Sequence, residues 1–161
     1  MSIAGSGHSS TGSSARGVVA AMMALVMALL VLTMMLEDRT DDLSQVEGLG
    51  SFVAGQIATQ AFAGAICGWL LATFFGRSGG VGWVLSVLGG LLVTLLAGAL
   101  AGVLQSLPEI LSEGLALTEA LKVAVGLLVV IFASAGRPMV AVGWLALILL
   151  THVLAARQRR G

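Results

Sequence analysis

The chain has 161 residues, of which 58% are hydrophobic and only 10% are charged, and its mean hydropathy is +1.04. This composition excludes an ordinary soluble domain and is typical of an integral membrane protein, so the lipid bilayer is its expected partner. The eight basic and eight acidic residues cancel. No basic surface therefore predicts nucleic acid as a partner.

Few side chains in the sequence are suited to chemistry. Cys67 is the only cysteine, and His8 and His152 are the only histidines, which excludes an internal disulfide and leaves no metal-ligand spacing. Paired buried carboxylates, a Ser/His/Asp set and a GxxxxGK phosphate loop are all absent from the sequence. We expect no enzyme activity, no catalytic residue, no metal site and no cofactor, and we interpret Cys67 as a small core residue.

The N-terminal part of the sequence predicts a tail and a first membrane span. Residues 1–16 are rich in Ser and Gly and contain no aromatic residue, so we expect a disordered tail. The uncharged run 18–36 follows, and as a helix it extends for about 28 Å, close to the thickness of the hydrocarbon. Five acidic residues against Arg39 alone then predict a solvated loop over 37–50.

Two further spans are predicted over 52–75 and 81–106. In both, a residue that is small or carries an amide recurs at every fourth position, which is typical of close helix packing in membranes. The first row reads Gln56, Gln60, Gly64, Gly68, Ala72 and Gly76, and the second reads Gly82, Ser86, Gly90, Thr94, Gly98, Gly102 and Ser106.

The short turn 76–80 predicts that these two spans form an antiparallel hairpin. Counting outward from the turn places Gly68 opposite Gly90 and Gly64 opposite Thr94. We therefore expect the two rows to face each other, with most of their surface used inside the monomer. The residues predicted to pack the helices are Gly64, Gly68, Gly82, Ser86, Gly90, Thr94, Gly98 and Gly102.

The C-terminal part of the sequence leaves the number of spans open. Pro108 is expected to end the third span. A fourth span over 115–134 requires Glu119 and Lys122 to reach the interface, where they can form an ion pair, whereas a re-entrant 123–134 leaves four spans. The last span is predicted over 139–156. The predicted fold is an all-α, polytopic transmembrane helical bundle of five spans in one domain, 17–161.

The positions of the basic residues predict the orientation. With five spans, Arg16, Arg77 and Arg137 fall on one side and the five other basic residues on the other, which favours a cytoplasmic C-terminus in a bacterial inner membrane. With four spans, both termini are cytoplasmic and the division is again five to three.

A short internal repeat is one interpretation of the two Gly-Arg turns. Gly76-Arg77 precedes Gly82-Trp83, and Gly136-Arg137 precedes Gly143-Trp144, at an offset of 60 to 61 residues. Chance similarity in a glycine-rich chain is the other interpretation. Either way, Arg77 and Arg137 are candidate contacts for lipid headgroups, and both tryptophans are expected at the membrane interface.

The sequence predicts a small multi-pass membrane protein without catalytic chemistry of its own, acting as an accessory or oligomerising subunit. Its partner is expected to be a second copy of the chain or a larger membrane protein. The alternative is a small transporter, channel or holin-like pore that uses a polar track of Gln56, Gln60 and Thr94, with Gln105 as a further candidate.

Overall fold

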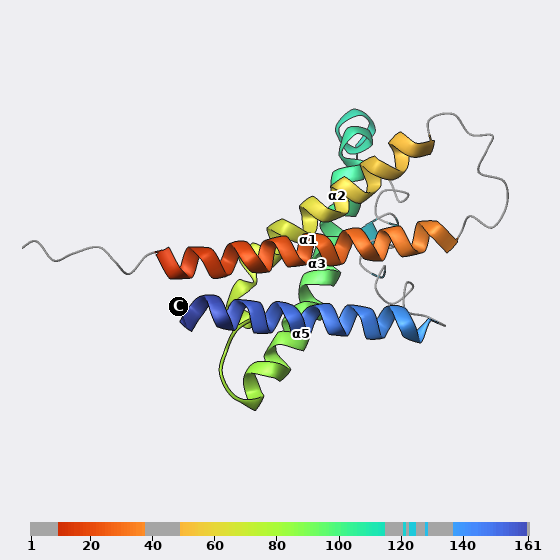
Figure 1. Ribbon diagram of the computed structural model, residues 1–161. Coiled ribbons are helices and arrows are strands. Elements are labelled where there is room, and N and C mark those ends of the chain that lie inside the picture. Colours follow the sequence, from red (N-terminus) through yellow and green to blue (C-terminus); the bar gives the residue numbers. More distant parts are fainter. Residues whose placement is uncertain are drawn as a thin grey trace, which may run out of the picture.

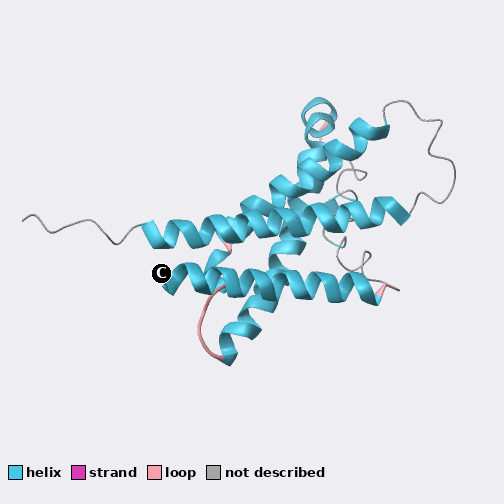
Figure 2. Cartoon of the chain, in the orientation of Figure 1, coloured by secondary structure: helices cyan, strands magenta, loops and turns pink. Residues whose placement is uncertain are grey.

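The structure is a computed structural model, and it describes residues 10–37, 49–114, 121, 123–124, 128 and 137–160. The described residues form α-helices and one short 3-10 helix, and no strand is found among them (Figure 2). The α-helices are α1 (Ser10–Glu37), α2 (Leu49–Leu70), α3 (Gly80–Glu113) and α5 (Pro138–Arg160), and the 3-10 helix η2 (Ala72–Phe74) follows α2. Long apolar segments in α1, α3 and α5 are sufficient to cross a membrane.

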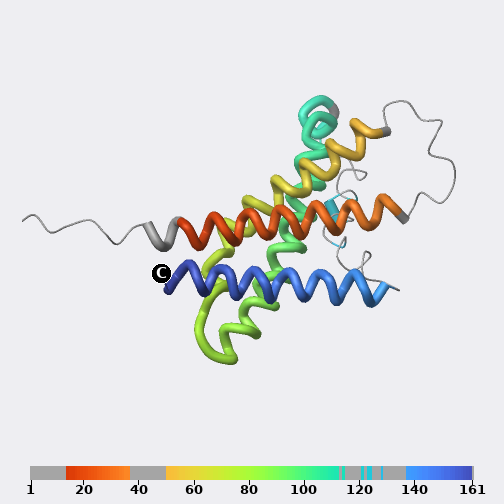
Figure 3. The backbone as a smooth tube through the Cα atoms, in the orientation of Figure 1, coloured from red at the N-terminus to blue at the C-terminus, as the bar shows by residue number. Residues whose placement is uncertain are grey.

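The helices α1 and α5 lie side by side and run in opposite directions (Figure 1). α2 packs along α1 in the most extensive helix contact, and α3 crosses behind α1 and α5 and contacts all three of these helices (Figure 3). The hydroxyl of Ser14 in α1 donates a hydrogen bond to Oε1 of Gln158 in α5, at 2.9 Å. The start of α1 and the end of α5 therefore lie at the same end of the bundle.

We call this the arginine end of the bundle. Arg16 is placed there by its guanidinium, which lies 5.5 Å from the centre of the Trp69 ring at the end of α2. The other arginines at this end follow α2 or close α5, and they are Arg77, Arg157, Arg159 and Arg160. Arg137 precedes the first residue of α5 and so lies at the opposite end.

Glycines let α2 approach α1 closely. A Cβ atom added at Gly64 would lie 2.6 Å from the carbonyl oxygen of Met23, and one at Gly68 would lie 2.7 Å from Met23 Cβ. Met23 and Met27 are fully buried, as expected for flexible side chains that fill gaps in a core. Cys67 is also buried, which confirms its interpretation as a core residue.

The row of small residues in α3 is buried along its whole length, from Gly82 to Ser106. Its closest neighbours differ from the predicted ones, because Gly90 faces the side chain of Ile148 in α5 and Thr94 bonds to Trp144 in α5. The predicted pairing of Gly68 with Gly90 and of Gly64 with Thr94 is therefore corrected. Gly64 and Gly68 of α2 face α1, and Gly90 and Thr94 of α3 face α5.

The ends of α2 and α3 explain this difference. α2 ends at Leu70, where the sequence predicted a span to residue 75. The connection to α3 is consequently residues 71–79, which is long enough to fold against α5 instead of closing a tight hairpin. Gly76 and Gly79 both have positive φ in this connection, 76° and 84°.

Two other helix boundaries also differ from the predictions. Residues 10–16, which were expected in a disordered tail, belong to α1, and Ala15 among them is only 3% exposed. Contacts with α2 and α5 offset the low helix propensity of this Ser- and Gly-rich segment. α3 continues through Pro108 to Glu113. Its last turns change direction and are seen nearly end-on in Figure 1, as expected when proline removes a hydrogen bond.

Five predicted spans are not confirmed. Of the helices that the structure describes, α1, α3 and α5 are apolar enough to span, while α2 is not among them. The predicted fourth span, 115–134, and its Glu119 and Lys122 lie outside the described residues, apart from positions 121, 123–124 and 128. Five crossings would also put the ends of the chain on opposite sides, whereas Ser14 and Gln158 are in contact.

Candidate functional site

The connection 71–79 is held against the end of α5 by direct contacts. The backbone N–H of Gly76 donates a hydrogen bond to Nδ1 of His152, at 3.2 Å, and Nη2 of Arg159 donates to the carbonyl oxygen of Ala72, at 3.0 Å. A Cβ atom added at Gly76 would lie 2.9 Å from the backbone of Ala155. Only glycine permits this approach, because the φ of residue 76 is positive and because a side chain there would collide with α5.

His152 is the buried centre of this junction, with only 3% of its surface exposed. Because Nδ1 accepts the hydrogen bond from Gly76, the neutral imidazole carries its proton on Nε2. The ring of Trp83 lies over the imidazole, with 4.5 Å between the ring centres and 39° between the planes. His152 is therefore a structural hydrogen-bond acceptor inside the fold.

A basic cavity opens beside this junction, and we call it the arginine pocket. Its volume is about 210 Å³. None of the side chains that line it is acidic. The lining residues are Arg77, Ser78 and Gly79 of the connection, Trp83 of α3, and His152, Val153, Ala156, Arg157 and Arg160 of α5.

The arginines of the pocket leave most of their hydrogen-bond donors available. Nε of Arg77 donates to the carbonyl oxygen of Thr73 at 3.0 Å, which orients its guanidinium. Arg157 and Arg160 form no hydrogen bond or ion pair with the part of the chain that the structure describes. At the start of α3 the Gly82 N–H donates to the carbonyl of Gly79, whereas the N–H groups of Gly80 and Val81 precede the first intrahelical acceptor and receive no side-chain cap from Gly79. The pocket is therefore rich in donors.

The two predicted headgroup contacts lie at opposite ends of the bundle. Arg77 lines the arginine pocket, whereas the carbonyl of Arg137 accepts hydrogen bonds from Val140 and Ala141 at the start of α5. The five-span prediction grouped Arg77 and Arg137 on one side, and this placement does not confirm it. The two tryptophans of the proposed repeat also differ, because Trp83 lies at the arginine end and Trp144 contacts the middle of α3.

The residues of the predicted polar track do not line a common cavity in the structure. Gln60 lies on the buried face of α2, 5% exposed, and its Oε1 has no hydrogen-bond partner among the described residues. Gln56 and Gln105 are half-buried. Thr94 is directed to α5, where it accepts a hydrogen bond from Trp144. None of these residues lines the arginine pocket or the groove described next.

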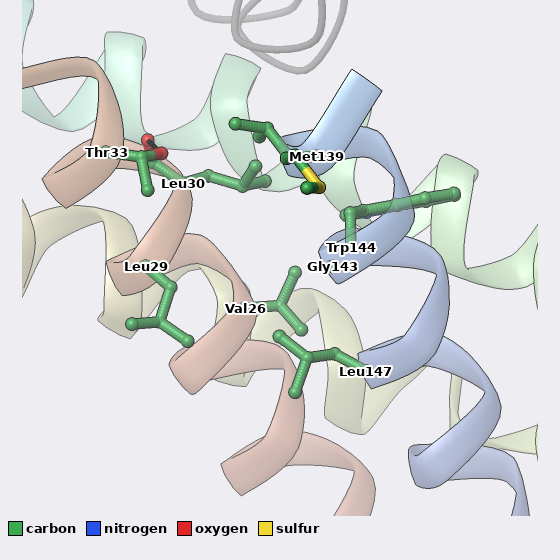
Figure 4. Close-up of a pocket in the computed structure, with 9 residues that line it drawn as sticks. Val26, Leu29, Leu30, Thr33, Met139, Gly143, Trp144 and Leu147 are labelled. Atoms are coloured by element: carbon green, nitrogen blue, oxygen red, sulfur yellow. Dashed lines mark hydrogen bonds between the residues drawn. The ribbon is translucent and has the colours of Figure 1, made fainter. Parts of the chain in front are cut away.

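An apolar groove of about 340 Å³ lies between α1 and α5, toward the end opposite the arginines. Figure 4 shows its side chains, which are Val26, Leu29, Leu30, Thr33, Met139, Val140, Gly143, Trp144 and Leu147. The Thr33 hydroxyl donates to Leu30, and the indole N–H of Trp144 donates to Thr94. Both polar groups are already paired, so the groove offers van der Waals contact without directional recognition.

Several residues of the arginine pocket were not predicted from the sequence. Arg157 and Arg160 were treated only as charges that set orientation, and their grouping with Arg77 depends on the antiparallel course of α5. Their spacing of three residues, which puts both on one helix face, was the signal present in the sequence. Among the residues that the structure describes, no cluster of His, Cys, Asp or Glu could hold a metal ion.

Comparison with known proteins gives no relative for this chain. No protein-family model matches it, and neither a curated protein nor a solved structure matches it.

Proposed function

We propose that this chain is an integral membrane protein without catalytic chemistry of its own, which acts as an oligomerising subunit. The apolar helices α1, α3 and α5 support its place in the bilayer. The observation that carries the assembly role is that α2 has two faces of small residues. One face packs against α1 inside the monomer, and the other face, which we call the open face, is exposed.

The inner face of α2 is occupied by α1, which contacts Gly64 and Gly68. The open face is formed by Ala54, Gly55 and Ala58, all of them exposed. A Cβ atom added at Gly55 would have no neighbour within 4 Å among the described residues. Small residues in this arrangement let a second helix approach its backbone closely in a membrane.

Exposed aromatic side chains flank the open face of α2. Phe52 and Phe62 are 59% and 58% exposed. A protein helix packs against these small residues more closely than lipid does. We infer that this neighbour is α2 of a second copy, related by a two-fold axis, because a self-complementary face needs no other partner.

The same arrangement supports a four-crossing topology. α2 has 22 residues, a length of about 33 Å as a helix, and it packs along α1. Four crossings put both ends of the chain on one side, in agreement with the contact between Ser14 and Gln158. The concentration of basic residues at that end favours the cytoplasm, and we propose the bacterial inner membrane as the location.

Cross-linking through a single cysteine tests the assembly role. Cys67→Ala removes the native thiol, and Gly55→Cys then places one thiol on the open face of α2. We expect a disulfide or bis-maleimide dimer in native membranes. The matched control is Leu107→Cys, which is exposed on α3 toward the same end of the bundle. Absence of a dimer with Gly55→Cys, or equal dimer with the control, contradicts assembly through α2.

A small transporter is the second candidate, and one observation favours it. Oε1 of Gln60 is buried without a hydrogen-bond partner among the described residues, and a buried acceptor of this kind is costly unless a ligand or water satisfies it. Gln56→Leu with Gln60→Leu separates the two functions. Retained dimer with lost flux of a small polar solute supports transport, whereas lost dimer with unchanged flux supports the assembly role.

A further inference from the structure

We propose that the arginine pocket binds a phosphate-bearing anion, which is either the headgroup of an anionic phospholipid or free phosphate. This site is separate from the open face of α2, so it goes beyond the assembly role and does not depend on it. The inference rests on the charge, size and position of the pocket.

The charge of the pocket calls for an anion. Arg77, Arg157 and Arg160 come together from two segments that are far apart in the sequence, and no acidic side chain lines the space between them. Like charges held together without a counter-ion repel one another, and a bound anion relieves this repulsion. Each guanidinium presents a planar fork of donors that suits two phosphate oxygens.

The neighbouring groups add further donors for the same ligand. Arg77 is held by Thr73, so its remaining N–H groups are oriented before any ligand arrives. The start of α3 contributes uncapped backbone N–H groups and the positive end of its helix dipole. His152 also lines the pocket, and its Nδ1 is already used by Gly76, which leaves Nε2–H as its donor.

The size of the pocket limits what can enter. Its volume of about 210 Å³ is below the range of roughly 300–1,000 Å³ in which drug-sized ligands bind. A single phosphate group is therefore a better fit than a nucleotide. Trp83, Val153 and Ala156 form the apolar part of the wall, which suits the glycerol carbon atoms next to a phospholipid phosphate.

The position of the pocket matches the place of a lipid headgroup. It lies at the arginine end, where α5 finishes and α3 begins, and Trp83 beside it is 43% exposed. Tryptophan is enriched at the level of the headgroups, and basic pockets between helices at the cytoplasmic side recognise phosphate headgroups. Both features place the ligand phosphate at the boundary between lipid and water.

Native mass spectrometry of the purified full chain in detergent tests the proposal. Phosphatidylglycerol, phosphatidylcholine and inorganic phosphate are added separately, and bound copies are counted. We expect retention of phosphatidylglycerol over phosphatidylcholine if the source is a lipid. If the source is free phosphate, we expect inorganic phosphate to bind and to compete with phosphatidylglycerol. Binding of neither anion overturns the proposal.

Matched double variants separate the pocket from general attraction between charges. Arg157→Gln with Arg160→Gln removes two pocket cations that have no partner in the described structure, so the fold should persist. Arg16→Gln with Gln158→Glu lowers the charge of the same end by the same two units without touching the lining or the bond from Arg159 to Ala72. We expect the pocket variant to weaken anion binding at least about tenfold and the control less than about threefold.

Equal weakening by both double variants overturns the proposal, because it shows that only net charge matters. Arg157→Lys with Arg160→Lys provides a further check, since lysine keeps the charge and lacks the planar fork. We expect partial retention of binding in this variant. The dimer formed by Gly55→Cys serves as an independent readout, so failure of anion binding and failure of assembly are distinguishable.

Discussion

The indole N–H of Trp144 donates a hydrogen bond to the hydroxyl of Thr94, at 3.1 Å. The same hydroxyl donates to the carbonyl of Gly90 one turn earlier, at 2.6 Å. The Thr94 hydroxyl therefore donates a hydrogen bond within α3 and accepts one from α5. Next to it, Gly90 leaves room for Ile148 of α5. These contacts set the register between the two helices.

Replacing Thr94 should weaken the contact between α3 and α5. Thr94→Val keeps the shape and leaves the indole N–H without its acceptor. We expect a loss of about 0.6 kcal/mol, and less than about 2 kcal/mol, in the free energy of unfolding, as for other hydrogen bonds between membrane helices. Unfolding by SDS in mixed micelles measures it. In a double-mutant cycle with Trp144→Phe, the two losses should be less than additive, and full additivity would argue against the bond.

Replacing His152 should loosen the connection 71–79. His152→Leu removes the acceptor of the partly buried Gly76 N–H, and an unpaired donor costs up to about 1–3 kcal/mol when it is buried. Proteolysis rates at the arginine end, together with unfolding in mixed micelles, report the change. His152→Asn offers an oxygen acceptor at a similar distance along the side chain and should recover part of the loss. Equal loss in both variants would mean that ring packing on Trp83 matters more than the hydrogen bond.

Two glycines inside helices, one packed and one exposed, should change the stability of the protein in opposite directions when each is replaced by alanine. Gly64→Ala places a methyl group 2.6 Å from the carbonyl oxygen of Met23, so we expect a loss of about 1–3 kcal/mol from overpacking. Gly143 in α5 has no neighbour within 4 Å in the described structure, so Gly143→Ala should be neutral or stabilise by up to about 1 kcal/mol. Thermal unfolding of both variants in detergent decides this, and the same sign of change in both would contradict the packing at Gly64.

Cysteine labelling should place the arginine end on one side of the membrane. In a Cys67→Ala background, Ser78→Cys in the connection should react with an impermeant maleimide only from the cytoplasmic face, as the positive-inside rule predicts. Ser112→Cys, near the end of α3, should react only from the opposite face. Labelling of intact cells and of inverted vesicles makes the comparison. Labelling of both positions from one face would mean that α3 does not cross.

The sequence predicted the helical membrane class because the length of each apolar run follows directly from the order of the residues. It also predicted which face of α3 is buried, since every small residue in the row from Gly82 to Ser106 is covered. The neighbour on that face could not be predicted. Small residues specify close approach and do not identify the helix that approaches, so Gly68 packs on α1 and Gly90 on α5.

The candidate site was only partly predictable for a related reason. Arg77 was identified from its turn, but Arg157 and Arg160 join it only because α5 returns to the arginine end. The number of crossings decides whether α5 returns to that end, and it depends on α2, which is not among the described helices that are apolar enough to span. The role of His152 depends on the backbone N–H of Gly76, and sequence patterns do not show backbone donors that lack a partner.

The junction between the connection and α5 has a consequence for biogenesis. α1 and α2 are synthesised first and can pack through Gly64 and Gly68 during translation of the rest of the chain. The carbonyl of Ala72 already accepts a bond from the Phe75 N–H, but the N–H of Gly76 must wait for His152, which is translated 76 residues later. Until α5 inserts, this N–H needs water or a chaperone. A ribosome stall before His152 should therefore give a chain that is inserted and protease-sensitive at residues 71–79.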